Sequence, residues 1–260
     1  MMTHGPSLVE MHLSVQDLSW MPERIYNAEL AIHMPEYHDG RLLDPASPDE
    51  STRQYTSQIY AQASRRGAAW APFFRGARPK AVFHPGGMGV EPASEGAIRL
   101  MRDQLDKTIR EMKEAAGEDV EILIENLPAH CWFFGGDWIA NIFTSGRELA
   151  EACEKHGIGA TLDLCHLFLA ANDRKYDVMD EIRAAKPYVR HVHYSDARGI
   201  DGEGLQIGSG DMPLSQYLAE LADLNVKAVP EIWYGHEYEG AGFVTAWKEA
   251  EKMMAGVPVG

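Results

Sequence analysis

Short apolar runs recur along the chain, and stretches with a helical pattern of apolar positions separate them. Several of these runs are almost continuously apolar, which is the pattern of parallel strands covered on both faces. We predict strands at Val9–Ser14, Glu29–His33, Lys80–His84, Val120–Glu125, Gly159–Asp163, Val189–His193 and Lys227–Ile232.

The stretches between these strands carry recognisable helix boundaries. Ser145 is a suitable N-cap and Gly157 a suitable C-cap for the helix that they enclose, and Pro213 favours a helix start directly after it. Ile98 and Leu105 belong to an apolar face at helical spacing. We predict helices at Glu91–Ala116, Gly146–His156, Leu214–Leu224 and Phe243–Met254.

Strands that alternate with helices indicate a parallel α/β protein. We predict a (β/α) TIM barrel that forms a single domain over residues 1–260. The pattern supplies seven strands, whereas a closed barrel has eight, so the first strand is either missing from this chain or irregular. A doubly wound open sheet is the alternative, and the position of the polar residues disfavours it.

Charged and imidazole side chains stand where successive predicted strands end. In a barrel these carboxyl ends converge on one face, where burial without a partner would be costly. Carboxylates and neutral imidazoles are ligands of Mn, Zn, Co and Fe, so we expect a divalent cation there. The residues concerned are His33, His84, Glu125, Asp163, His193 and Glu231, with His191 as a candidate for orienting His193.

A less specific interpretation of these strand-end residues is a structural one. A buried ion-pair network would need cationic partners, yet these strand ends carry almost no Lys or Arg. The aromatic segment Trp132–Phe134 with Trp138 follows Glu125, and it suits a sugar-stacking wall, a subunit contact or packing on the outer helices.

Composition narrows the class of protein. With 45% hydrophobic residues among 260, the chain can bury a sizeable core, and no apolar run reaches the length of a membrane span. Three cysteines without a pairing pattern and the lack of a signal peptide lead us to expect a cytoplasmic protein. The net charge of -15 opposes a non-specific grip on nucleic acid, although it leaves room for a local basic groove, so we do not expect a nucleic-acid partner.

At these residues the sequence resembles the xylose-isomerase-like TIM-barrel superfamily, which includes sugar and sugar-phosphate isomerases and epimerases and also endonuclease IV. The resemblance runs from about Val9 to Met254. Its segments are I-H-M-P-E-Y at Ile32–Tyr37, F-H-P-G-G at Phe83–Gly87, I-E-N-L-P at Ile124–Pro128, T-L-D-L-C-H at Thr161–His166, H-V-H-Y-S-D at His191–Asp196, I-G-S-G-D at Ile207–Asp211 and P-E-I at Pro230–Ile232.

The epimerases of this superfamily imply a site with one metal. The resemblance assigns that metal to Glu125, Asp163, His193 and Glu231. It assigns substrate contacts to His166 and to Arg198, whose spacing from the histidine is one residue short of the family pattern.

Endonuclease IV implies three metals instead. His33, His84 and Glu125 match its first metal site, and the second uses the same four ligands as the epimerases. The third needs His166 and an Asp-x-His pair, but those two positions are Gly202 and Gly204, which offer no side-chain ligand. This departure argues against phosphodiester cleavage.

The resulting hypothesis is a metal-dependent isomerase or epimerase of a sugar or sugar phosphate. It would act through an enediolate, with Glu125 and Glu231 as acid and base. An endonuclease IV-like abasic-site endonuclease is the first alternative, and a non-catalytic barrel that binds a carbohydrate or a partner is the second. The sugar, the metal and the number of ions stay open, and so does the oligomeric state, for which a homo-oligomer is one alternative.

Overall fold

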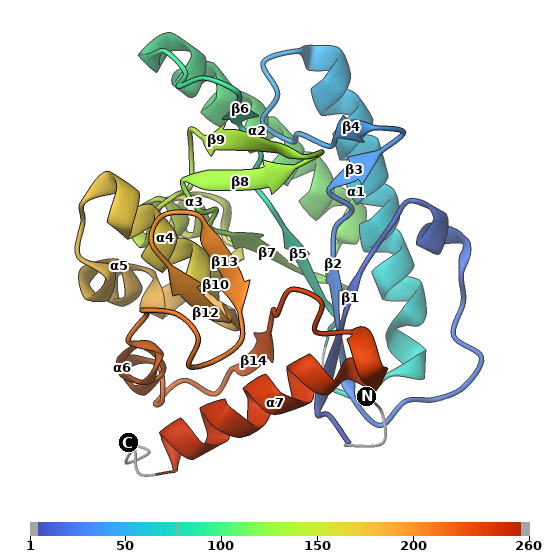
Figure 1. Ribbon diagram of the computed structural model, residues 1–260. Helices are drawn as coiled ribbons and strands as arrows, with labels where there is room; N and C mark the ends of the chain where they lie inside the picture. Colours follow the sequence, from blue (N-terminus) through green and yellow to red (C-terminus); the bar gives the residue numbers. More distant parts are fainter. Residues whose placement is uncertain (1–4, 77, 256–260) are drawn as a thin grey trace.

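The computed structural model describes residues 5–76 and 78–255 of the chain. Its main sheet contains seven parallel strands in the order β1-β2-β5-β7-β10-β11-β14. Helices surround this sheet in the manner of a (β/α) barrel (Figure 1). The seven strands are β1 (Leu8–His12), β2 (Glu29–His33), β5 (Lys80–Phe83), β7 (Glu121–Glu125), β10 (Gly159–Asp163), β11 (Val189–Tyr194) and β14 (Lys227–Pro230). All seven predicted strands are therefore confirmed, with ends that differ by a few residues.

The barrel has one seam. Strands β1 and β14 are the two ends of the sheet, and no backbone hydrogen bond joins them within the described part of the chain. The missing eighth strand of the prediction corresponds to this gap. Helix α7 (Glu237–Met254) runs across the lower part of Figure 1, from the side of β1 toward that of β14.

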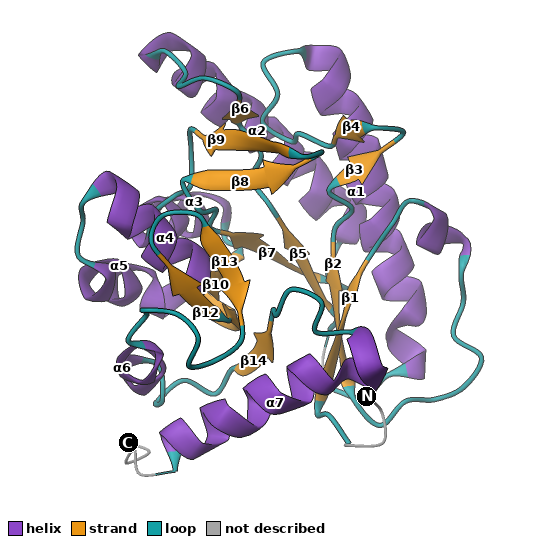
Figure 2. Ribbon diagram, in the orientation of Figure 1, coloured by secondary structure: helices purple, strands orange, loops and turns teal. Residues whose placement is uncertain are grey.

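Helices and short antiparallel elements complete the fold (Figure 2). The other helices are α1 (Glu50–Trp70), α2 (Glu95–Ala116), α3 (Gly146–His156), α4 (Leu164–Arg174), α5 (Val178–Ala185) and α6 (Leu214–Glu220), with 3-10 turns at Gln16–Ser19, Ala71–Phe73 and Lys186–Tyr188. The antiparallel strands are β3 (Tyr37–His38) with β4 (Arg41–Leu42), β6 (Met88–Gly89) with β9 (Gly136–Ala140) and β8 (His130–Phe133), and β12 (Asp196–Arg198) with β13 (Gly202–Leu205).

The predicted boundaries of α3 are confirmed. The Ser145 hydroxyl accepts a hydrogen bond from the Glu148 backbone N–H, and Gly157 takes the left-handed conformation with φ 61°. Helix α6 ends earlier than predicted, at Glu220, and the last helix begins earlier, with non-helical backbone from Tyr238 to Gly240. Among the described residues, no helix combines the length and apolar character that crossing a bilayer requires.

Two aspartates, Asp44 and Asp196, fix the loops that follow two barrel strands. Asp44 accepts hydrogen bonds from the backbone N–H groups of Ala46 and Gly87, both at 2.9 Å, and so holds the loop after β5. Asp196 accepts from the N–H groups of Gly208 and Gly210 in the same way, which accounts for the I-G-S-G-D segment. The segments Phe83–Gly87 and Ile207–Asp211 therefore have a structural explanation in addition to the family resemblance.

We predict that Gly86→Ala destabilises the protein by at least about 1–2 kcal/mol, because Gly86 has φ +73° and an L side chain there is strained. An added Cβ would also lie 2.1 Å from Asp44 Oδ1. Urea unfolding measures the effect. Gly96→Ala is the control, because this helical glycine has only ordinary contacts around an added Cβ, and it should be neutral or slightly stabilising. Equal midpoints for the two variants would contradict this account.

Candidate metal centre at the barrel mouth

Twelve acidic and imidazole side chains gather at the carboxyl ends of the barrel strands. The carboxylates are Glu10, Glu36, Glu125, Asp163, Glu203 and Glu231, and the imidazoles are His12, His33, His84, His166, His191 and His193. Every ion pair that these carboxylates make in the described ranges is to a histidine, and none is to Lys or Arg. A salt-bridge network with Lys or Arg therefore does not account for the cluster.

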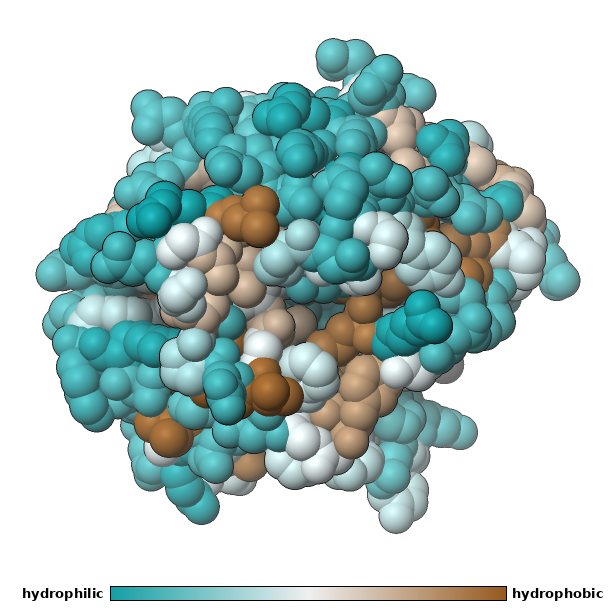
Figure 3. All heavy atoms as spheres, turned by 90° about the horizontal axis from the view of Figure 1, so that it is seen from above, coloured by the Kyte–Doolittle hydropathy of each residue, from teal (hydrophilic) through white to brown (hydrophobic). Residues whose placement is uncertain are grey.

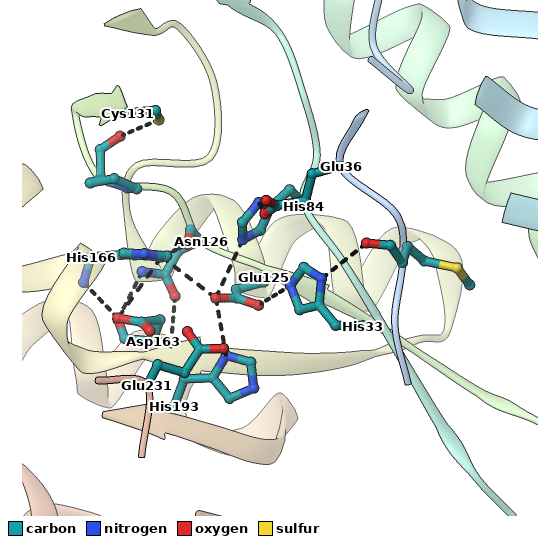
Figure 4. Close-up of polar contacts among 12 residues, drawn as sticks. His33, Glu36, His84, Glu125, Asn126, Cys131, Asp163, His166, His193 and Glu231 are labelled. Carbon is teal, nitrogen blue, oxygen red and sulfur yellow. Dashed lines mark hydrogen bonds and ion pairs between the residues drawn. The ribbon is translucent and has the colours of Figure 1, made fainter. Parts of the chain in front are cut away.

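Glu125, at the end of β7, lies at the centre of this cluster (Figure 4). Its side chain is completely buried, and four imidazoles surround it. The nearest ring nitrogens belong to His193 at 3.2 Å, His33 at 3.4 Å, His166 at 3.5 Å and His84 at 3.6 Å. The structure thus brings His33 and His84, both singled out in the sequence, against the same carboxylate.

Asp163 and His166 are positioned by the start of a helix. Asp163 ends β10 and caps α4, where its Oδ1 accepts a hydrogen bond of 2.6 Å from the His166 backbone N–H. Asn126 connects this strand end to β7, because its side-chain amide donates to the Asp163 carbonyl and accepts from the Asp163 N–H. The His166 ring approaches the Asn126 carbonyl through Nδ1 at 2.9 Å. A carbonyl can only accept, so Nδ1 is the protonated nitrogen in this bond.

The four predicted metal ligands meet. Glu231 follows β14, and its Oε1 lies 3.3 Å from His193 Nδ1. Glu125, Asp163, His193 and Glu231 each offer one ligand atom, and these atoms all lie within 4.8 Å of one another. Four strand ends that are far apart in sequence therefore converge on one point.

Burial and the neighbouring charges shift the protonation of these groups in opposite directions. Burial alone would raise the pKa of Glu125, but the imidazolium forms of His193 and His84 hold it well below its usual range. Burial likewise opposes the charged form of His193, yet Glu10, Glu231 and Glu125 raise its pKa well above normal. Burial raises the pKa of Asp163 to about 7, although His166 partly offsets this effect. Carboxylates and imidazoles in this cluster therefore stabilise each other's charged forms against the cost of burial, and Asp163 is the carboxylate least stabilised in this way.

The donor set fits a divalent cation. The carboxylate atoms Glu10 Oε1, Glu125 Oε2 and Glu231 Oε1 are buried and have no hydrogen-bond partner of good geometry. An unsatisfied carboxylate oxygen is costly away from water, and a cation would satisfy it. Carboxylate oxygens with imidazole nitrogens suit Mn, Zn, Co or Fe.

Several members of the cluster were missed in the sequence. Glu10 Oε2 lies 2.6 Å from His191 Nε2 and 3.0 Å from His193 Nε2, and His12 Nε2 lies 3.0 Å from Glu231 Oε1. Glu10 and His12 stand two apart on β1, so they share one face of the strand. This spacing of a carboxylate and an imidazole within an apolar run was the available signal.

Two further carboxylates also escaped the sequence analysis. Glu36 lies three residues after His33, in the loop that follows β2, and its Oε1 lies 2.8 Å from His84 Nδ1. Glu203 Oε1 lies 3.5 Å from His166 Nε2. Each extends the cluster outward from a histidine that the sequence had singled out.

The structure does not bring Arg198 into this cluster. Its guanidinium is exposed, donates to the Ser209 carbonyl and lies 3.8 Å from Asp211. A substrate role for Arg198 stays a prediction that rests on the resemblance alone. At Gly204, with φ +67°, an added Cβ would lie only 1.7 Å from Trp233 Cδ1, so the indole occupies the space that a side chain at position 204 would need.

A cavity of about 1060 Å³ opens onto the cluster. Asp163, His166 and Glu231 line it, whereas Glu125 and His193 do not. Trp132 and Phe133 of the β8–β9 hairpin also line it. Seen from above in Figure 3, apolar and weakly polar side chains gather in the middle of this face, and hydrophilic ones surround them.

Comparisons with known proteins agree with this architecture. The chain is 26% identical over 224 residues to an uncharacterised protein of Methanocaldococcus jannaschii, which covers 85% of this chain and 70% of that one. It is 24% identical over 217 residues to the apurinic-apyrimidinic endonuclease 1 of Plasmodium berghei, a match that covers 79% of this chain but only 39% of that protein.

Solved structures share the fold at lower sequence identity. A D-tagatose 3-epimerase-like protein superposes with a TM-score of 0.71 at 20% identity, over 96% of this chain and 89% of that chain. The family described as the xylose isomerase-like TIM barrel matches residues 24–255. This match, together with the barrel-like order of the parallel strands, shows that the chain belongs to the xylose isomerase-like TIM-barrel family.

Proposed function

We propose that this protein is a metal-dependent isomerase or epimerase of a sugar or sugar phosphate. The observation that carries the proposal is the convergence of Glu125, Asp163, His193 and Glu231 beside a cavity large enough for such a substrate. The similarity to a D-tagatose 3-epimerase-like structure supports the fold on which this chemistry would rest.

The four converging residues would hold the cation. When bound, a divalent cation supplies Lewis-acid stabilisation for the negative charge that develops on the oxygens of an enediolate. Proton transfer at the neighbouring carbon is then left to side chains of this chain. We assign it to Glu125 and Glu231.

The two glutamates differ in access to the cavity. Glu231 lines the cavity and its side chain is 23% exposed, so it can reach a substrate carbon directly. Glu125 is fully buried and does not line the cavity, because the four imidazoles stand around it. Its role as the second proton carrier therefore requires a shift of a neighbouring imidazole, whereas its role as a ligand requires none.

Other residues would orient the substrate and exclude water. The protonated Nδ1 of His166 is engaged by Asn126, which leaves Nε2 directed toward Glu203 at the cavity wall. This nitrogen is placed to contact a substrate hydroxyl. Trp132 and Phe133 offer aromatic faces against which a sugar ring or carbon chain can pack.

We predict that added Mn²⁺ raises the melting temperature and that chelation lowers it, because a ligand of the native state stabilises that state. Asp163→Ala should weaken Mn²⁺ binding by more than about 100-fold. His166→Ala should weaken it by about 10-fold or less, since His166 is assigned to the substrate. Differential scanning fluorimetry and equilibrium dialysis provide the two measurements. Equal losses in both variants would favour a larger metal cluster that includes His166.

We predict that Glu231→Gln lowers turnover by roughly 10²- to 10⁴-fold, the range typical of a positioned general base, while part of the metal binding survives. Glu125→Gln should lose turnover together with much of the metal, because Glu125 lies at the centre of the ligand set. The assay follows exchange of deuterium from the reacting carbon of labelled ketoses and ketose phosphates into water. Turnover with full retention of the label would instead indicate a hydride shift.

A second candidate function is incision of DNA at abasic sites. Two observations favour it: the contacts of His33 and His84 with Glu125, and the similarity to an apurinic-apyrimidinic endonuclease. The Gly204 backbone packed against Trp233 opposes it, because it leaves no room for a third-metal ligand at that position. The net charge of -15 opposes it as well.

We predict no metal-dependent incision of duplex DNA that contains a single abasic site. The substrate is an end-labelled oligonucleotide with a tetrahydrofuran residue, incubated with Mn²⁺- or Zn²⁺-loaded protein and resolved by gel electrophoresis. Incision by the wild type that Glu125→Gln abolishes would make the endonuclease the preferred function.

A further inference from the structure

The seam of the barrel passes beside the metal centre. Strands β1 and β14 face each other there without a backbone hydrogen bond between them, among the residues that the structure describes. The cavity extends into this gap, since it is lined by residues of both strands and by Phe243 and Trp247 of α7. Whatever connects the two edges at this level must therefore come from side chains or from a ligand.

Three ligand-type side chains face one another across the seam. Glu10 and His12 come from the same face of β1, and Glu231 comes from the end of β14. His12 Nε2 lies 3.0 Å from Glu231 Oε1 and 3.9 Å from Glu10 Oε1. One ligand atom from each of the three lies within 4.8 Å of the other two.

Glu10 supplies independent evidence for a ligand between these three side chains, because one of its oxygens is buried without a partner. Its side chain is 1% exposed, and His191 and His193 both approach Oε2. The other oxygen, Oε1, is buried and has no hydrogen-bond partner, with His12 Nε2 at 3.9 Å. A buried carboxylate oxygen without a hydrogen-bond partner is costly, and a cation at this position would supply the missing partner.

We propose that Glu10, His12 and Glu231 form a second divalent-cation site, which we call the seam site, and that its cation links the two open edges of the barrel. Two carboxylate oxygens and one imidazole nitrogen form a ligand set for Mn²⁺, Zn²⁺, Co²⁺ or Fe²⁺, with coordination positions left for water. The site is separate from the set that includes His33 and His84. It rests on the proposed function only through Glu231, which it shares with the proposed metal centre.

The seam site has a mechanical consequence. A cation held from β1 on one side and from β14 on the other would join edges that lack backbone hydrogen bonds, so it would suppress local opening of the barrel there. The amides of Leu8–His12 and Lys227–Val229 should then exchange with solvent more slowly when the site is filled. An ordinary ion pair between His12 and Glu231 would give no such dependence on metal.

The experiment combines Mn²⁺ stoichiometry with hydrogen exchange on the full chain. Equilibrium dialysis counts the Mn²⁺ equivalents of the wild type, His12→Ala, Asp163→Ala and His38→Ala, and mass spectrometry follows exchange in the two edge segments with and without Mn²⁺. His12 is suited to substitution because its side chain is 57% exposed. His38, in the β3–β4 hairpin and outside the cluster, is the matched control. His12→Gln repeats the test with a polar side chain if the alanine variant is poorly folded.

The seam site predicts that His12→Ala binds one Mn²⁺ fewer than the wild type, with affinity at that site reduced on the order of 10²-fold. Exchange of both edges should slow on Mn²⁺ addition in the wild type, Asp163→Ala and His38→Ala, but not in His12→Ala. Equal stoichiometry and an equal exchange response in the wild type and His12→Ala would overturn the proposal.

The outcomes for the two sites are distinguishable. A single Mn²⁺ that Asp163→Ala loses and His12→Ala retains would leave the proposed metal centre in place and eliminate the seam site. A single Mn²⁺ with the opposite behaviour would support the seam site and contradict the centre. A wild type that binds no Mn²⁺ would contradict both.

Discussion

The central constraint on this structure is the burial of several carboxylates whose ion-pair partners, in the described part of the chain, are all imidazoles. Glu125 is the extreme case, since it is completely buried within a ring of four histidines. Removing a carboxylate from water is costly unless positive charge or hydrogen-bond donors replace the water. In the described ranges no Lys or Arg pairs with the cluster, so its imidazoles are the only cationic side chains that can do so. A divalent cation would satisfy the buried carboxylate oxygens, and the strand ends at the barrel mouth bring the side chains that could hold it together.

The barrel assembles these ligands by simple means. The last residues of parallel strands lie on one face of the barrel. Helix α4, whose N-cap is Asp163, places His166 near the same point. Asn126 ties the end of β7 to the end of β10 through its side-chain amide. Asp44 holds the loop after His84. Rigid elements with hydrogen-bonded side chains therefore carry the candidate site, as a preorganised centre requires.

Access from solvent divides the cluster into two layers. Glu231, Asp163 and His166 line the cavity, whereas Glu125 and His193 lie behind them. Asp163 and Glu231 thus belong both to the candidate ligand set and to the cavity wall, so an ion held there would be within reach of a small molecule in the cavity. The Trp233 indole occupies the space that a side chain at position 204 would need, and the resemblance to endonuclease IV assigns a third-metal ligand to that position.

Much of the fold could be predicted because its signals are local. Buried parallel strands are nearly continuous apolar runs, and α3 carries both of its caps in sequence, so these elements were found. Helix α1 was not predicted, because the face it buries includes Arg53, Thr56, Ser57 and Ser64 in place of an apolar stripe. Its packing depends on partners such as Glu111 on another helix, which no local pattern reveals.

The site divides along the same line. Carboxylates such as Glu125 and Asp163 stand out in the sequence because each ends a buried apolar strand, where a charged side chain is costly unless it has a partner. Glu10 did not stand out, because its partners His191 and His193 lie more than 180 positions away in the sequence. They meet Glu10 only when the sheet curves round and brings β1 close to β11. The sequence determined which residues lie at strand ends. Only the tertiary structure decided which of them face one another and that the barrel stays open at its seam, because both depend on how the sheet curves and closes and on no property of any single segment.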